Sequence, residues 1–183
     1  MAMAAPTYYT ADMVRQIPDD GNTYELVHGE LLVTPAPRLW HEVLALRLGV
    51  ALSEYLRVET VGQVFATRSD ISWGLDDVLV EPDVFVAPLD HVRTLDWARI
   101  RHLLLAVEIL SPSSVRYDRF TKRRLYQERG VPLYWILDGD AHSVEVWRPE
   151  DRFPMVERER LVWHPAGAAT PFTLELAELF KPI

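Results

Sequence analysis

The chain has 183 residues, of which 49% are hydrophobic and 25% charged, a composition typical of a globular domain that buries its own core. It contains no cysteine, which excludes disulfides, thiolate zinc sites, iron–sulfur clusters and cysteine nucleophiles and fits a reducing cytoplasm. The formal net charge of −8 argues against a protein that binds nucleic acid by charge alone. It does not exclude an enzyme with a metal site, because acidic metal ligands would themselves make the net charge more negative.

No apolar run approaches the roughly 18 residues that a membrane-spanning helix needs. The first seven residues lack the basic and apolar regions of a secretory signal. We therefore expect a cytoplasmic protein with no membrane association.

The first third of the sequence predicts a short helix, a hairpin and a long helix. Thr10 is a suitable helix cap, Pro18 ends the helix, and His28-Gly29 is suited to a tight turn between two strands. Apolar residues then recur at three- and four-residue steps, the strongest helical pattern in the chain. The predicted elements are a helix over 10–17, strands over 23–27 and 30–34, and a helix over 38–58.

The remaining sequence predicts several strands and one further long helix. Residues 103–110 form a near-continuous apolar run, typical of a strand buried on both faces, and Glu108 is its only charge. Gly130 and Pro132 end the helix that follows. The predicted elements are strands over 61–67, 69–73, 84–86, 103–110, 133–137, 143–147 and 156–163, and helices over 117–129 and 174–180. We expect one mixed α/β domain over residues 1–183.

Three charged residues occupy unusual positions. Asp83 follows Pro82 at the start of a predicted strand, and Glu108 lies within the most apolar strand. Lysine occurs only at positions 122 and 181 among 19 basic residues, so Lys122 is a distinctive choice in an arginine-rich chain. Burying a lone carboxylate costs several kcal/mol unless it is paired, hydrogen-bonded or bound to a metal.

Two interpretations of Asp83, Glu108 and Lys122 remain open from the residues alone. A divalent cation would relieve the cost of two neighbouring carboxylates, and oxygen ligands favour magnesium, calcium or manganese. The ammonium would then stabilise negative charge developing on a phosphate, or help to deprotonate the attacking water. Alternatively, the three form a buried salt-bridge cluster in which Lys122 neutralises Asp83 or Glu108.

These residues belong to a longer series of motifs in one colinear order between about residues 8 and 148. With this series the sequence resembles the Uma-two type, restriction-endonuclease-like family of the PD-(D/E)XK nuclease superfamily. The motifs that carry the resemblance are Tyr24-Glu25-Leu26-Val27-His28-Gly29-Glu30-Leu31, His41, Glu81-Pro82-Asp83-Val84, Val107-Glu108-Ile109-Leu110-Ser111-Pro112-Ser113-Ser114, Asp118, Lys122, Tyr126, Gly130-Val131-Pro132 and Tyr134-Trp135-Ile136.

The resemblance implies a restriction-endonuclease-like core over about residues 23–148, with a mixed β-sheet flanked by helices and an N-terminal β-hairpin. It also implies cleavage of DNA phosphodiester bonds with Mg or Mn. Asp83 and Glu108 match the acidic metal ligands, and the backbone carbonyl of Ile109 is a further ligand by analogy. The wider superfamily places its lysine at the position that holds Leu110 here. Lys122 matches a lysine moved to the following helix.

Several other residues are candidates for supporting roles. Glu25 and Glu30 both lie on the predicted hairpin, where one acidic residue would complete the site; we favour Glu30, and a solvated hairpin edge is the simpler alternative for both. His41 is a candidate for positioning substrate or relaying a proton. Asp118 suggests a surface pair with Lys122 one turn later, and Tyr126 suggests packing.

Two functions from different classes follow. The first is a metal-dependent DNA endonuclease that acts as a homodimer, because cleavage of both strands by a single-site domain generally needs two copies. We expect the aromatic residues Trp147, Phe153 and Trp163 to be exposed. The second is a catalytically inactive nuclease fold that serves as a binding or interaction module.

Overall fold

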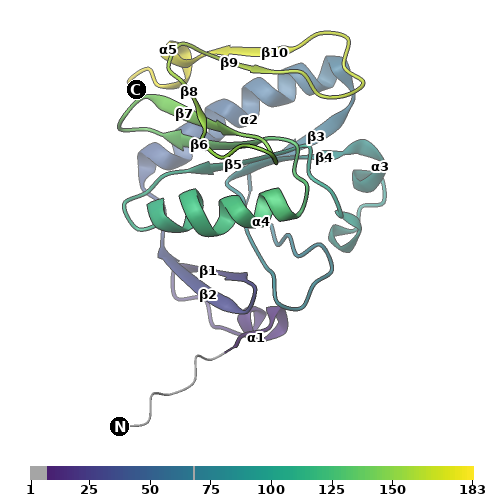
Figure 1. Cartoon of the computed structure of the whole chain (residues 1–183), viewed down its shortest axis with the longest axis vertical. Helices are drawn as coiled ribbons and strands as arrows, with labels where there is room; N and C mark the ends of the chain where they lie inside the picture. Colours follow the sequence, from purple (N-terminus) through teal and green to yellow (C-terminus); the bar gives the residue numbers. More distant parts are fainter. Residues whose placement is uncertain (1–7, 68) are drawn as a thin grey trace.

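Six strands form one mixed sheet in the order β3-β4-β5-β6-β7-β8 in the computed structural model (Figure 1). The structure describes residues 8–67 and 69–183. The prediction of no secretory signal falls on residues 1–7, which lie outside this range. The strands are β3 (Gly62–Phe65), β4 (Val84–Pro88), β5 (Leu105–Ile109), β6 (Tyr134–Asp138), β7 (Ser143–Trp147) and β8 (Met155–Glu157). Strands β5 and β6 run parallel, and the other neighbours run antiparallel. The α/β fold class predicted from the sequence is confirmed.

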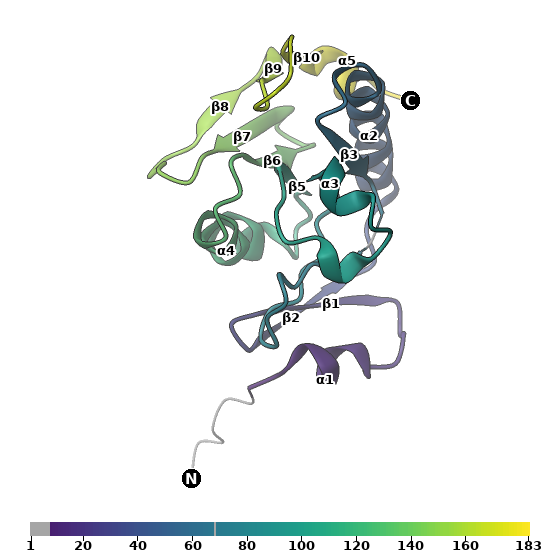
Figure 2. The ribbon, with the colours of Figure 1, turned by 90° about the vertical axis from the view of Figure 1, so that its right-hand side faces the viewer.

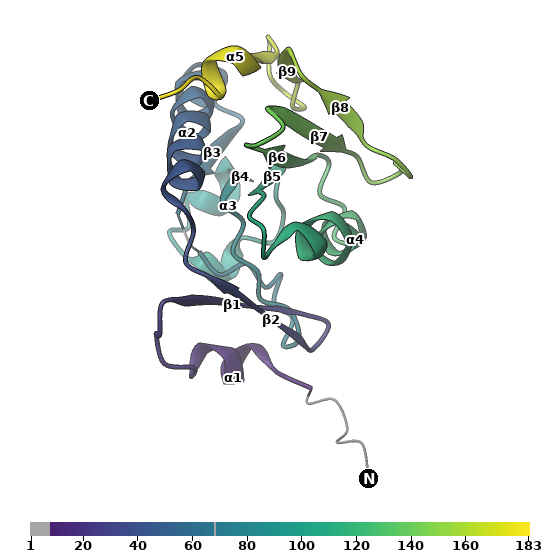
Figure 3. The same ribbon diagram turned by 90° about the vertical axis from the view of Figure 1, so that its left-hand side faces the viewer.

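Helices cover both faces of this sheet (Figures 2 and 3). The long helix α2 (Leu39–Glu59) packs its apolar stripe on one face, against Leu105, Val107 and Ile109 of β5. On the other face, η2 (Tyr117–Lys122) continues into α4 (Arg123–Glu128) and covers the side to which Ala106 belongs. Because side chains alternate along a strand, Glu108 shares the η2 and α4 face with Ala106.

The N-terminal hairpin is attached below the sheet (Figure 1). Helix α1 (Ala11–Arg15) is capped by Thr10, as predicted, and β1 (Asn22–Val27) pairs with β2 (Glu30–Pro35). The turn residues His28 and Gly29 both have positive φ, 50° and 79°, the geometry of the tight two-residue hairpin turn. Leu26 exchanges backbone hydrogen bonds of 2.6 and 2.8 Å with Leu79. These bonds bring β1 beside the loop that leads into β4.

The predicted helix over residues 117–129 is present but begins irregularly. Its first part, η2, has the wider turn of a π-helix, and α4 follows directly. Such wider turns are frequent at functional sites. The helix ends at Glu128, and Gly130, with a φ of 65°, turns the chain just beyond it, in agreement with the predicted stop.

Three sequence predictions were wrong in detail. Residues 69–73 make only one bridge, between Ile71 and Val80, because Trp73 and Gly74 turn the chain with positive φ. The single strand predicted over 156–163 is two strands, since β8 pairs with β7 and β9 (Arg160–Trp163) pairs with β10 (Phe172–Glu175). Because residues up to Glu175 pair in β10, the last helix, α5 (Leu176–Leu179), begins later than the predicted residue 174.

The predicted exposure of the C-terminal aromatic residues was mostly wrong. Trp147 and Trp163 are buried because their strands place them in the two main clusters of the core. Phe153 is 84% exposed.

The remaining short elements are α3 (Leu89–Val92) and η1 (Trp97–Arg99). Within the described residues, none of the helices has the length and apolar character needed to cross a membrane.

Candidate active site

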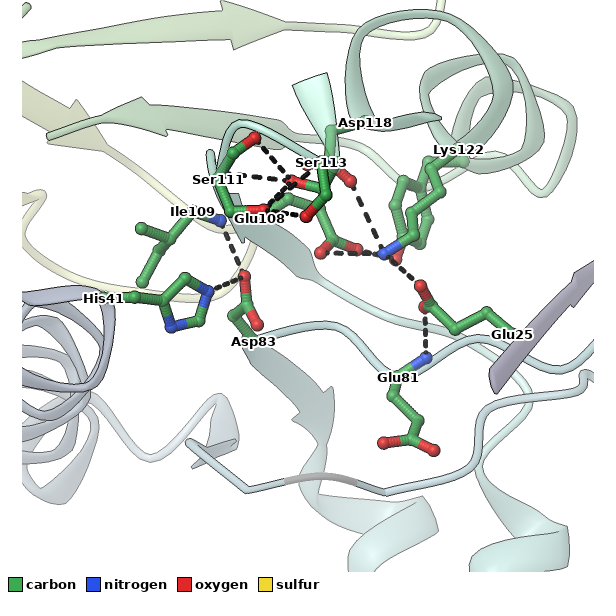
Figure 4. A network of polar contacts seen from close by, with 12 residues as sticks. Glu25, His41, Glu81, Asp83, Glu108, Ile109, Ser111, Ser113, Asp118 and Lys122 are labelled. Atoms are coloured by element: carbon green, nitrogen blue, oxygen red, sulfur yellow. Dashed lines mark hydrogen bonds and ion pairs between the residues drawn. The ribbon is translucent and has the colours of Figure 1, made fainter. Parts of the chain in front are cut away.

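Four carboxylates and one lysine gather where the hairpin, the sheet and η2 meet (Figure 4). Glu25 comes from β1, Asp83 immediately precedes β4, Glu108 lies in β5, and Asp118 and Lys122 lie in η2. Glu25, Glu108, Asp118 and Lys122 are each no more than 4% exposed. The structure therefore brings together the three residues that the sequence marked as unusual, Asp83, Glu108 and Lys122, and adds two acidic neighbours.

Lys122 is the centre of the buried part of this cluster. Its Nζ lies 2.7 Å from Oε2 of Glu25, 3.0 Å from Oε2 of Glu108 and 3.5 Å from Oδ1 of Asp118. The Glu25 carboxylate also accepts a 2.8 Å hydrogen bond from the backbone N–H of Glu81. One ammonium thus joins a strand of the hairpin, the central strand of the sheet and its own helix.

Glu108 is held by the chain at both of its carboxylate oxygens. Oε2 faces Lys122, and Oε1 accepts a 2.8 Å hydrogen bond from the hydroxyl of Tyr126. Lys122 and Tyr126 are four residues apart on the helix and so lie on one helical face. This explains how one helix can hold both ends of a carboxylate that projects from β5.

Asp83 occupies a separate and more open position beside Glu108. The antiparallel register pairs Val84 with Val107, so Asp83, just before the start of β4, stands next to Glu108. Its Oδ2 accepts hydrogen bonds of 2.7 Å from the N–H of Ile109 and 3.0 Å from Nε2 of His41. Burial alone would lower the pKa of His41, but the hydrogen bond to Asp83 and the negative charges of Asp83, Glu42 and Asp118 together raise that pKa above its ordinary value.

A cavity of about 110 Å³ is bordered by both parts of the cluster. Its lining includes Asp83, Glu108, Ile109, His41 and Lys122. Asp83, with 22% of its side chain exposed, lines the part of the cavity nearer to solvent, and the buried Lys122 lines the inner part. The cavity is the place where a small ligand would meet both carboxylates.

The cluster contains four acidic side chains and one lysine, and burial changes the pKa values of several of them. Burial raises the pKa of Glu108 well above its usual value, and burial also raises the pKa of Asp118, to about 6. Burial alone would lower the pKa of Lys122, but Glu108, Glu25 and Asp118 together raise it well above its ordinary value. Lys122 is therefore a fixed positive charge, and it cannot by itself balance the acidic groups around it.

This donor set fits a hard divalent cation. Asp83 and Glu108 both line one cavity, and the cluster has four acidic side chains, three of them around the single ammonium. In its ionised form it therefore carries an excess of negative charge that a cation would offset. Across the described ranges, no three acidic or histidine side chains are arranged to hold a metal unaided. Magnesium commonly uses one or two carboxylates and keeps several of its waters, so two carboxylates and a backbone carbonyl are sufficient.

The two hairpin candidates separate clearly. Glu25 is buried against Lys122, whereas Glu30, which we favoured from the sequence, is exposed beside the hairpin turn. Glu30 pairs with Val27 in the register, so it shares a face with Glu25 but lies farther along the hairpin, beyond the cluster. The alternation of side chains in the hairpin could not show which glutamate reaches Lys122, because Glu25 and Glu30 lie on the same face.

Two further residues differ from their sequence interpretation. Asp118 does pair with Lys122 across one turn, but the pair is buried and not on the surface. Tyr126 packs in the core, and its hydroxyl also bonds Glu108. The four-residue spacing of Asp118, Lys122 and Tyr126 was the available signal for both. The salt-bridge alternative for Lys122 is present in part, since Lys122 pairs with Glu108, while Asp83 bonds His41 and Ile109.

Comparisons with known proteins agree with this architecture. A crystal structure from Anabaena variabilis ATCC 29413, described as "a putative nuclease belonging to DUF820", superimposes with a TM-score of 0.75 and 23% sequence identity. The match covers 93% of this chain and 97% of that one, and at this identity it establishes the shared fold. Among curated proteins, none matches the chain. The model of the Uma2 family matches residues 11–177. The chain therefore belongs to the Uma2 family, whose description is "Putative restriction endonuclease".

Proposed function

We propose that this protein is a Mg- or Mn-dependent endonuclease that hydrolyses phosphodiester bonds in DNA. The observation that carries the proposal is the convergence of Asp83 and Glu108 on one cavity beside the buried ammonium of Lys122. Membership of the Uma2 family supports the reaction class. The two carboxylates and the carbonyl of Ile109 are the groups that would hold the cation.

A bound divalent cation would activate a water molecule and polarise the scissile phosphate. Lys122 keeps its proton, because three carboxylates surround it. Its part in the reaction is therefore to stabilise the negative charge that develops on the phosphate, and not to deprotonate the water. An ammonium fixed in a desolvated position is more effective at this than a mobile, hydrated one.

Two neighbouring residues would support this arrangement without forming part of the ligand set. His41 donates to Asp83 and fixes the orientation of its carboxylate. Glu25 ties Lys122 to the hairpin and, through the N–H of Glu81, to the loop that carries Asp83. Removal of either group would loosen one side of the cavity.

The decisive experiment is a plasmid-nicking assay with Mg²⁺ or Mn²⁺. The wild type should nick or linearise the plasmid, and Glu108→Ala should not. Glu178→Ala is a matched control, because Glu178 is an exposed glutamate whose partner, Lys181, lies far from the cavity. A wild type that is inactive with both metals would contradict the proposal and favour the inactive binding module.

Cleavage of both DNA strands by a domain with one site also requires a second copy. We infer that the protein acts as a homodimer, since twofold dimers are the commonest symmetric assemblies. The exposed side chain of Phe153 remains available for such a contact.

A further inference from the structure

Glu108 is held in a fixed orientation by two side chains of one helix. The hydroxyl of Tyr126 donates to Oε1 at 2.8 Å, and Nζ of Lys122 lies 3.0 Å from Oε2. An ionised carboxylate offers about four lone-pair positions, so these two contacts leave acceptor capacity on each oxygen. The carboxylate can therefore be held by the helix and still offer an oxygen to the cavity that it lines.

Tyr126 is itself rigidly placed. It is fully buried, and its ring packs 4.7 Å from the ring of Tyr134 and 6.2 Å from that of Trp73, measured between centroids. A buried tyrosine hydroxyl needs a hydrogen-bond partner, and Glu108 is the one that this hydroxyl has. Because this packing fixes the tyrosine side chain, its hydroxyl holds Oε1 of Glu108 in a defined position.

We propose that Tyr126 is a positioning residue, whose hydroxyl fixes the orientation in which Glu108 offers an oxygen to a divalent cation. This inference rests on the function proposed above. Without the hydroxyl, Lys122 alone would hold Glu108, and the carboxylate would rotate away from the geometry that it shares with Asp83. Loss of such an outer partner typically weakens metal binding by about 10- to 100-fold.

Tyr134 provides a matched control for this inference. It is also buried, and its hydroxyl donates a 3.0 Å hydrogen bond to the backbone carbonyl of Asp118. Tyr134→Phe and Tyr126→Phe thus each remove one buried hydroxyl from the same pair of packed rings. Only Tyr126→Phe removes a contact to a proposed metal ligand.

The test is titration calorimetry of Mn²⁺ into the wild type, Tyr126→Phe and Tyr134→Phe, with urea unfolding of each metal-free protein beside it. We expect Tyr126→Phe to raise the Mn²⁺ dissociation constant by about 10- to 100-fold and Tyr134→Phe to leave it unchanged. A merely structural role would lower the stability of both variants and leave both dissociation constants at the wild-type value.

The outcomes separate this inference from the proposed function. If the wild type binds Mn²⁺ and Tyr126→Phe binds it equally or more tightly, the positioning role is overturned while the metal site stands. Equal weakening in both variants would also overturn it, because the effect would then be a general loosening of the core. If the wild type binds no Mn²⁺, the proposed function and this inference both fail.

Discussion

Among the described residues, Glu25 forms the shortest ion pair of Lys122, with 2.7 Å between Oε2 and Nζ, although the two residues lie far apart in the sequence. The contact exists because Leu26 bonds Leu79 and docks the hairpin against the loop before β4. The hairpin therefore contributes a side chain, Glu25, to the candidate site.

Glu25→Ala should destabilise the protein strongly. Removing one partner of a buried ion pair typically costs about 3–5 kcal/mol, because the remaining charge stays buried with less compensation. Urea unfolding of the metal-free protein measures this cost. Glu30→Ala is the comparison on the same hairpin, and we expect its effect to lie within about 0.5 kcal/mol, as for most exposed positions. Equal effects of the two substitutions would contradict the assignment of Glu25 to the cluster.

Lys122→Arg should abolish most cleavage. Loss of one electrostatic stabiliser typically lowers the rate by about 10²–10³-fold. Lys122 is only 4% exposed, and a forked guanidinium cannot reproduce the three contacts of Nζ there. The larger side chain should also overpack the core, at a cost of about 1–3 kcal/mol of stability. Nicking rates and urea unfolding measure the two effects. Lys181→Arg, at the only other lysine, is the control. Comparable nicking rates for the wild type and Lys122→Arg would remove Lys122 from the proposed mechanism.

Divalent cations should stabilise the folded protein. At a concentration one hundred times the dissociation constant, a ligand bound only by the folded state adds about 2.7 kcal/mol to the free energy of unfolding. Thermal unfolding with and without Mg²⁺ or Mn²⁺ measures this gain, and titration calorimetry measures the binding. The double variant Asp83→Ala, Glu108→Ala should show neither effect. Equal heats of binding for the wild type and the double variant would contradict the metal site.

The protein should be a dimer in solution. Light scattering at tens of micromolar gives the mass directly, and we expect twice that of one chain. Phe153→Asp is an informative variant, because this side chain is 84% exposed and a charge there would disfavour an apolar contact. A monomeric wild type would leave single-strand nicking as the activity that one site can perform.

The sequence by itself determined most of the helices and strands around the candidate site and the identity of the unusual charges. The apolar run around Glu108, the turn at His28-Gly29 and the stop at Gly130 are local signals, and the structure agrees with each of them. Lys122 was marked by composition alone. These predictions succeeded because propensity, turn geometry and hydrophobic periodicity act over a few neighbouring residues.

Only the tertiary structure decided which of these residues meet. Whether Glu25 or Glu30 reaches Lys122 depends on how the hairpin docks on the loop before β4, and that docking is a contact between distant segments. The pairing partners of β8 and β9, and the burial of Trp147 and Trp163, have the same origin. The hydrogen bond from Tyr126 to Glu108 was hidden for a related reason, because a tyrosine at a helical spacing predicts packing whether or not its hydroxyl bonds a carboxylate. Local sequence does not encode the partner across the fold, and the partner determines both burial and charge.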